Sequence, residues 1–179
     1  MKAALLLCSL LFLQSLLLCG GTFAEVDART PGGDRFQFPH DALGEQPVLF
    51  ALAMGTTQSS GELQQEQLLQ WHRHLMESPL LLRGTEIYHF PVIGSAPRLV
   101  RGLIRRGIGR SYSDDVSPDR AAVLFVSDEH AFARQAGIPL DEQPTLALVL
   151  PSGEIAGYVK GPLGDQNLQE LQDLLDQHR

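Results

Sequence analysis

The sequence predicts an α/β domain: a central mixed sheet with helices on both faces, closed by a C-terminal β-hairpin and a helix. Two continuous apolar runs, residues 47–54 and 121–127, have the length and composition of strands that are buried on both faces. Helical patterns alternate with these runs, and such alternation implies a partly parallel sheet in three layers. Residues 145–150 and 154–160, joined by a Pro-Ser-Gly turn, predict the antiparallel hairpin.

The first helix is predicted after the first buried strand, from the loop over residues 55–61 to about Glu77. Ser59 and Glu62 have the spacing of a capping box, in which a hydroxyl and a carboxylate satisfy free N–H groups at a helix start. Pro79 ends the helix, because the residue before a proline disfavours helical geometry. The inward side is predicted to hold Leu68, Leu69, His72, Leu75 and Met76.

A strand over residues 86–92 and a second helix from Pro97 to about residue 109 are predicted next. We expect one face of that helix to be an apolar stripe and the opposite face to carry arginines. A short helix over residues 129–136 and a final amphipathic helix over residues 165–177 complete the domain. The expected apolar stripe of the second helix consists of Leu99, Val100, Leu103, Ile104 and Ile108, opposite Arg98, Arg101 and Arg105.

The N-terminus has the pattern of a secretory signal peptide over residues 1–24. Lys2 precedes an apolar run of roughly 16 residues, which is short of the ~20 needed to span a bilayer. Small residues at Thr22 and Ala24 favour cleavage after Ala24. The protein is therefore expected to be exported, to the periplasm or as a secreted protein. A retained membrane anchor and a lipoprotein acylated at Cys19 are the alternatives.

After the signal, residues 25–46 are polar and contain a Pro-Gly-Gly turn, so we expect an exposed lead-in before the domain at residues 47–179. Packing of Phe36, Phe38 and Leu43 on the edge of the domain is left open. Removal of Lys2 with the signal changes the net charge from −7 to −8, which argues against a nucleic-acid partner. Both cysteines, Cys8 and Cys19, lie in the predicted signal. The mature protein would then contain no thiol, and packing would have to stabilise it instead of disulfides.

From Ala121 onward, the residues resemble the thioredoxin superfamily. A strand ending at Asp128, a short helix, the Gln143-Pro144-Thr145 sequence, a hairpin and a last helix follow the order of that family. The resemblance implies a cis peptide bond at Gln143–Pro144 beside the active site, and it places the family's active cysteines in the loop over residues 54–62. That loop contains Thr56-x-x-Ser59, which resembles the Thr-x-x-Cys of peroxiredoxins with serine replacing cysteine. A hydroxyl cannot replace a thiolate in disulfide or peroxide chemistry.

A narrower resemblance is to the thioredoxin-like assembly factors of the mitochondrial ATP synthase and their bacterial relatives. It rests on the Tyr88-His-Phe-Pro91 strand, the arginine-rich helix over residues 98–110 and the tail over residues 128–164. It implies a non-catalytic role in assembling or chaperoning another protein.

Two candidate binding sites follow. In thioredoxin-like folds, the cleft beside the proline takes extended peptides by backbone pairing, which needs no cysteine; the alternative is a vestigial cleft. The second site is a basic patch for an acidic protein, an anionic lipid or a phosphate, with a solvated helix face as its alternative. The cleft residues are Thr56, Thr57, Ser59, Gln143 and Pro144; the patch residues are Arg98, Arg101, Arg105, Arg106 and Arg110.

Other chemistries have little support. His72 and His74, two residues apart on a helix, point to different sides and do not predict a metal site. There is no nucleophile elbow and no phosphate-binding glycine loop. We therefore expect a redox-inactive, non-enzymatic protein that binds or assembles another protein, without a cofactor and in an undetermined oligomeric state. The alternatives are a thiol-independent enzyme that uses Ser59 or a histidine, and a redox-related lipoprotein that retains Cys19.

Overall fold

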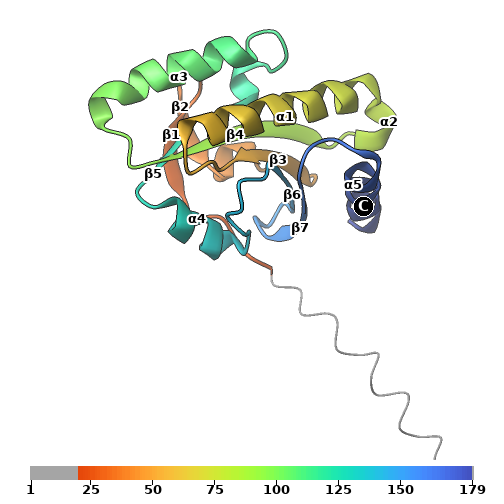
Figure 1. Ribbon diagram of the computed structural model, residues 1–179. Coiled ribbons are helices and arrows are strands. Elements are labelled where there is room, and N and C mark those ends of the chain that lie inside the picture. The colour runs from red at the N-terminus through yellow and green to blue at the C-terminus, as the bar shows by residue number, and fades with distance from the viewer. Residues whose placement is uncertain (1–19, 179) are drawn as a thin grey trace, which may run out of the picture.

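The computed structural model describes residues 20–178 and has a five-stranded mixed sheet at its centre (Figure 1). The strand order is β5-β4-β3-β6-β7, with β5, β4 and β3 parallel, and β6 and β7 antiparallel to their neighbours. The predicted signal lies, up to residue 19, outside the described residues. The strands are β3 (Val48–Ala53), β4 (Glu86–Gly94), β5 (Leu124–Val126), β6 (Thr145–Val149) and β7 (Ile155–Lys160).

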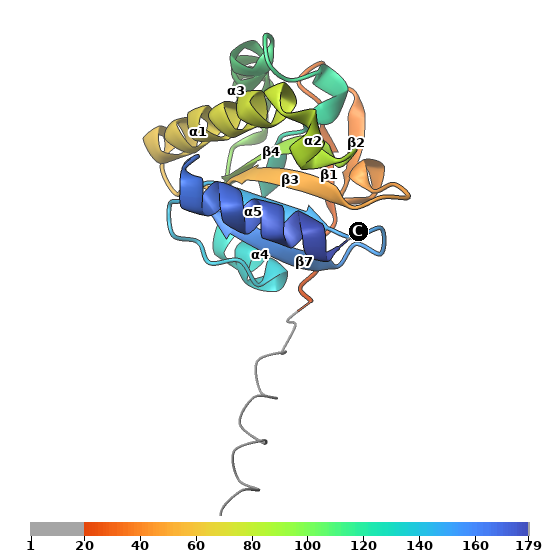
Figure 2. The ribbon, with the colours of Figure 1, turned by 90° about the vertical axis from the view of Figure 1, so that its right-hand side faces the viewer.

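Helices cover both faces of this sheet, so the predicted fold class is confirmed (Figures 1 and 2). Alternate side chains of β3 explain this arrangement, because successive residues of a strand point to opposite faces. Leu49 and Ala51 pack with α1 and α5, whereas Phe50 and Leu52 pack with α4. The helices are α1 (Gln58–Glu77), α2 (Pro79–Leu82), α3 (Arg98–Tyr112), α4 (Glu129–Ala136) and α5 (Asp165–Gln177).

The predicted exposed lead-in at residues 25–46 is corrected. This segment contains the antiparallel hairpin of β1 (Val26–Arg29) and β2 (Arg35–Phe38). Phe36 and Phe38 are buried in the core on the α4 side of the sheet. The reason is the alternation of polar and apolar residues in β2, which puts both phenylalanines on one face. The folded domain therefore begins well before residue 47.

The first helix begins slightly earlier than predicted. Thr57, not Ser59, is the N-cap of α1, and its hydroxyl accepts the N–H of Ser60 at 3.2 Å. The predicted end at Glu77 is confirmed, and the ranges predicted for α4 and α5 match the structure. Within residues 20–178, no helix combines the length and the apolarity that crossing a bilayer requires.

A buried pair of histidines joins α1 to strand β4. The His89 Nε2 atom lies 3.1 Å from the His72 Nδ1 atom, and the ring of Tyr112 meets that of His89 edge-on at 5.3 Å. Burial lowers the pKa of His89 to about 3 and also lowers that of His72, so both rings are neutral at physiological pH. Burial also raises the pKa of the Tyr112 phenol, which keeps this hydroxyl protonated.

Candidate functional site

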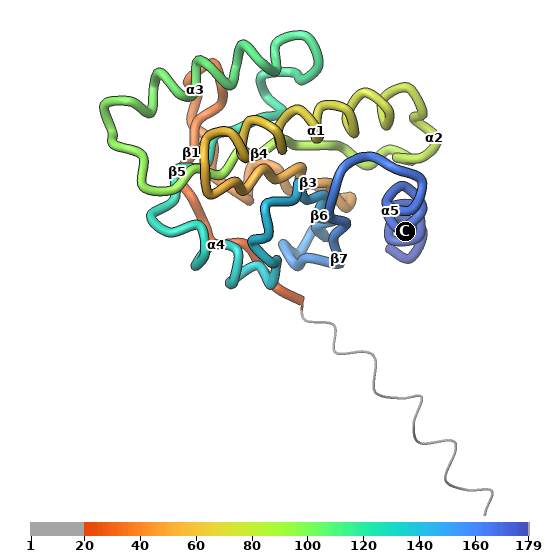
Figure 3. The backbone as a smooth tube through the Cα atoms, in the orientation of Figure 1, coloured from red at the N-terminus to blue at the C-terminus, as the bar shows by residue number. Residues whose placement is uncertain are grey.

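The candidate site lies where the parallel strands β3 and β4 end and helix α1 begins. The loop after β3 carries Thr56 and Thr57 into the first turn of α1, and the loop before β6 approaches from the other side (Figure 3). Ligands of open α/β sheets commonly bind at the carboxyl ends of strands, where helix N-termini offer free N–H groups. This geometry makes the region the first place to look for function.

Glu142 joins the two loops. Its Oε1 atom accepts the hydroxyl of Thr56 at 2.5 Å and the backbone N–H of Thr56 at 3.3 Å, and its Oε2 atom accepts the hydroxyl of Ser60. Glu142 has a φ of 62°, in the left-handed region that non-glycine residues rarely adopt. The carboxylate therefore occupies the space in front of the helix N-terminus, and we did not predict this from the sequence.

The predicted cleft residues come together only in part. Thr56, Thr57 and Ser59 are exposed at the start of α1, and Gln143 is exposed in the facing loop. Pro144 is buried, and its carbonyl accepts the N–H of Gly161 at 2.9 Å. The hydrogen bonds between the loop before β6 and the start of α1 come from Glu142, the residue that precedes the predicted Gln143 and Pro144.

The expected cis bond at Gln143–Pro144 is wrong. Within residues 20–178, the cis peptide bond is at Phe38–Pro39. The trans form is the ordinary state of an X–Pro bond, favoured by about 0.5–1 kcal/mol. Trp71 of α1 is buried, and its indole N–H donates to the Gly161 carbonyl at 3.1 Å.

A pocket of about 530 Å³ lies beside the predicted cleft, between the first turns of α1, the end of β4 and the middle of α3. Its walls contain two helical glycines, Gly61 on α1 and Gly107 on α3, and a Cβ added to either would meet nothing within 4 Å. Both pocket-lining positions therefore leave open space where another residue would carry a side chain. A volume of this size is typical of binding pockets.

Glu129 forms the acidic inner wall of the pocket. It is half-buried, and its Oε1 atom accepts the N–H of Gly94 at 2.8 Å. A Cβ at Gly94 would lie 2.0 Å from the Glu129 carboxyl, so glycine is required for this close approach. Glu62 adds a second carboxylate to the lining.

The predicted orientation of α3 is corrected for three residues of the expected apolar stripe, Leu99, Val100 and Leu103, which are exposed. The row formed by Ile104, Ile108 and Tyr112 faces inward and packs beneath the helix. Leu99 is 98% exposed and Leu103 is 60% exposed. Leu103 and Ile104 are one residue apart, about 100° around the helix, so only one of the two rows can lie against the sheet.

The predicted basic patch is split between two sides of α3. Arg101 turns inward, where its guanidinium stacks 5.0 Å from the Phe125 ring centroid and donates to the Ala96 carbonyl at 2.9 Å. Arg105 is half-buried, and its Nε atom is buried without a hydrogen-bond partner among the described residues. These two arginines are therefore part of the packing of α3.

Arg98, Arg106 and Arg110 are exposed, and none of them forms an ion pair within residues 20–178. Arg106 follows Leu103 by three residues and Arg110 follows it by seven, so all three lie along one outward side of the helix. After the exposed Arg98, the outer surface of α3 is thus apolar at Leu99 and Leu103 and becomes basic toward its end.

The chemistry of these residues is limited to hydrogen bonding, charge and apolar contact. Residues 20–179 contain no cysteine, so no thiol lies in this part of the chain. Within residues 20–178, no group of three or more histidine, cysteine or acidic side chains is arranged to hold a metal ion. Hydroxyls and a carboxylate lie at the helix N-terminus, where the thioredoxin resemblance places cysteines.

No protein-family model and no curated protein matches the chain, but solved structures do. The peroxidoxin BcpB of Mycobacterium tuberculosis has 14% identity over 89% of this chain and 97% of its own, with a TM-score of 0.53. Copper-bound ScoI of Arabidopsis thaliana has 9% identity over 87% and 99%, with a TM-score of 0.56. BsSco, a member of the Sco family of cytochrome c oxidase assembly proteins, has 9% identity over 88% and 95%, with a TM-score of 0.54.

These structural neighbours are thioredoxin-like proteins, and the match extends over most of each chain. The chain therefore has a thioredoxin-like fold, as its sequence predicts. Identities this low are evidence for the fold alone, because one fold carries many functions. The narrower resemblance to ATP synthase assembly factors stays a prediction.

Proposed function

We propose that this protein binds another protein through the outer side of α3 and the pocket between α1 and α3, and that it does so without thiol chemistry. The observation that carries the proposal is the exposure of Leu99 and Leu103 next to unpaired arginines. Leu99 is 98% exposed and Leu103 is 60% exposed, whereas the apolar residues of an amphipathic helix normally face the core. Exposed apolar residues that lie together mark surfaces where another molecule binds.

The exposed surface is continuous with the pocket. Leu103 precedes Gly107 by one helical turn, and Gly107 lines the pocket. An apolar side chain from a partner can therefore contact Leu103 and enter the space that Gly61 and Gly107 leave open. Apolar anchors in pockets supply most of the affinity in many protein interfaces.

Charge indicates the kind of segment that would bind. Arg106 and Arg110 are exposed cations without carboxylate partners among the described residues, in a chain with net charge −7. Arginine is enriched in interfaces because its planar guanidinium pairs well with carboxylates. Glu62 and Glu129 make part of the pocket lining acidic. We infer an amphipathic partner segment whose carboxylates lie toward Arg106 and Arg110.

An anionic membrane is the less favoured ligand for this surface. The chain has 21 acidic residues against 14 basic ones, so most of its surface would be repelled by anionic headgroups. An interfacial helix also needs a large apolar face, and α3 exposes its leucines only in its first half.

Capture of the partner tests the proposal. A photo-crosslinking amino acid at Leu103 of the full-length chain should trap one protein in the producing cell, and the same group at Leu80 should not. Leu80 is a matched control because it is 86% exposed on α2. The captured protein, once purified, should bind Leu103→Asp and the Arg106→Glu/Arg110→Glu pair at least about tenfold more weakly, a loss of about 1.4 kcal/mol.

Equal capture at Leu80 and Leu103, or unchanged affinity of both variants, would overturn the proposal. Binding of the wild type to vesicles of anionic phospholipid, lost in the same variants and accompanied by no captured protein, would assign the surface to a membrane instead. Charge reversal at Arg134, an exposed arginine on α4, controls for the general effect of added negative charge.

A further inference from the structure

Residues 21–23, which precede β1 by two residues, belong to the folded domain. The Gly21 carbonyl accepts the N–H of Ile155 at 2.9 Å, and Thr22 forms an antiparallel β-bridge with Glu154. Both contacts lie at the start of β7, which is an edge strand of the sheet. The segment therefore extends the sheet at the end of this edge, although the sequence predicts it to be removed.

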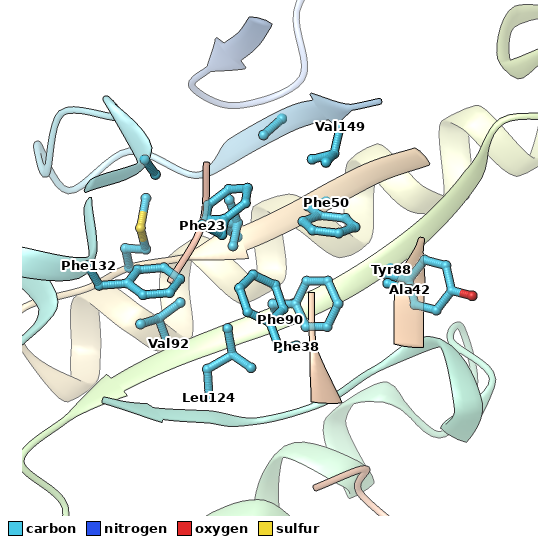
Figure 4. Packing of buried hydrophobic residues seen from close by; sticks show 14 of the residues in the cluster. Phe23, Phe38, Ala42, Phe50, Tyr88, Phe90, Val92, Leu124, Phe132 and Val149 are labelled. Carbon is cyan, nitrogen blue, oxygen red and sulfur yellow. The ribbon is translucent and has the colours of Figure 1, made fainter. Parts of the chain in front are cut away.

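Phe23 is a member of the main core. It is 5% exposed, and its ring centroid lies 5.4 Å from that of Phe38, 5.7 Å from that of Phe50 and 5.7 Å from that of Phe132. Figure 4 shows its ring among these side chains, which come from β2, β3 and α4. Loss of Phe23 would leave a cavity where three elements meet, and such cavities are costly.

The backbone at Gly21 also fits closely against α4. A Cβ at this position would lie 2.3 Å from the carbonyl oxygen of Ala136, the last residue of α4. Real side chains cannot approach so closely, so the contact requires glycine. The segment thus contacts the domain in three ways: through backbone pairing with β7, through the Phe23 ring in the core and through the close approach of Gly21 to α4.

These contacts conflict with cleavage after Ala24, which would remove all three residues. A signal peptidase needs small residues at the last and third-last positions of the leader. Cys19 and Gly21 satisfy this rule for a cut after Gly21, whereas cuts one or two residues earlier place Leu18 or Leu17 at the third-last position. Thr22 is exposed, so the new charged amino group would remain in water.

We propose that the leader is removed by cleavage after Gly21, so that the mature chain begins at Thr22. The mature protein then keeps Phe23 in its core and loses both Cys8 and Cys19. This cut removes the Gly21 hydrogen bond at the sheet edge and the close approach of Gly21 to α4, and it leaves Thr22 and Phe23 in the mature chain. This proposal does not depend on the proposed binding function.

The test is the N-terminus of the exported protein. The full-length chain, expressed with its own leader in an exporting bacterium, should give a product whose intact mass and N-terminal sequence start at Thr22. Ala24→Leu should give the same N-terminus, because residue 24 lies outside the leader. Cys19→Leu should accumulate as uncut precursor, whereas Cys19→Ser, which keeps a small residue, should be cut normally.

Three results would overturn the proposal. The first is a product that starts at Glu25 and no longer forms in Ala24→Leu. The second is a product that carries a lipid on Cys19 and no longer forms in Cys19→Ser. The third is a wild-type chain that is never cut.

A second measurement tests whether Phe23 belongs to the core. Phe23→Ala should lower the Tm of the exported protein by roughly 10 °C, and Thr22→Ala should leave it nearly unchanged. An unchanged Tm in Phe23→Ala would contradict the role of Phe23 in the core.

Discussion

The Glu142 carboxylate accepts both the backbone N–H and the hydroxyl of Thr56, although 86 residues separate the two in the chain. This contact holds the loop before β6 against the first turn of α1. It also fills the position where an extended peptide would meet the hydroxyls of the predicted cleft. A peptide that hydrogen-bonds the Thr56 hydroxyl therefore competes with Glu142, whereas Glu142 does not line the pocket between α1 and α3.

Replacement of Glu142 should loosen this junction. Glu142→Ala removes a charged acceptor of hydrogen bonds from Thr56 and Ser60, and we expect a loss of about 1 kcal/mol in the free energy of unfolding. Glu142→Gln keeps an acceptor and should lose less. Urea unfolding measures both, with Glu45→Ala as an exposed control. Full stability of Glu142→Ala would show that the contact contributes nothing.

The buried His72–His89 pair predicts a pH dependence of stability. The pKa of His89 is lowered to about 3, mainly by burial, while an unfolded histidine titrates near 6.5. Between these values the unfolded state binds a proton that the folded state does not, so stability falls as the pH falls. From pH 6 to pH 4, His89 should contribute a loss of about 1.4 kcal/mol per pH unit.

Denaturant unfolding at several pH values checks this contribution. His89→Leu should show a slope that is flatter by nearly that amount, even if its stability at pH 7 is lower because His72 loses its partner. His130→Gln, an exposed position on α4, controls for the removal of a histidine. Equal slopes in the wild type and His89→Leu would contradict the burial of a neutral imidazole.

Replacement by alanine should change the stability of the protein differently at two glycines of α3, Gly107 and Gly109. Gly107→Ala adds a Cβ into open space and improves helix propensity, so it should stabilise the protein by about 0.5–1 kcal/mol. At Gly109 the added Cβ would lie 2.9 Å from the Cβ of Pro31, which cannot move aside easily. Gly109→Ala should therefore gain nothing or lose stability. Thermal unfolding of the two variants side by side tests the packing of α3 against the β1–β2 hairpin.

The order of strands and helices could be predicted because each long element is defined by residues within its own segment. The apolar run of β3 and the capping and glycine signals of α4 define those elements locally. The β1–β2 hairpin was missed because its strands have four residues each and flank a Pro-Gly-Gly turn that also suits a loop. Its burial depends on Phe36 and Phe38 reaching a core built by distant segments.

The candidate site could be located but not described from the sequence. The loop over residues 54–62 lies where the thioredoxin resemblance places it, at the start of α1. No local pattern marks Glu142, because its role depends on a contact across the sheet. The exposure of Leu99 and Leu103 was missed because the two helical rows of α3 are equally apolar, and only packing distinguishes them.

The mature protein should be inactive in thiol assays. If the leader is removed, no cysteine remains, so insulin reduction and peroxide consumption should not exceed the background rate. A thiol reagent should label no group in the wild type and one group per chain in a Ser59→Cys variant, which places a thiol in the first turn of α1. Clear turnover by the wild type in either assay would contradict a function without thiol chemistry.

The most direct test of the proposed function is the affinity of the captured partner for a chain whose pocket is closed. Gly107→Phe places a large side chain in the space between α1 and α3, and Gly107→Ala is the matched variant that leaves most of this space open. Titration calorimetry with the purified partner should give a dissociation constant at least about tenfold higher for Gly107→Phe than for Gly107→Ala. Equal constants for the two variants would contradict binding at this pocket.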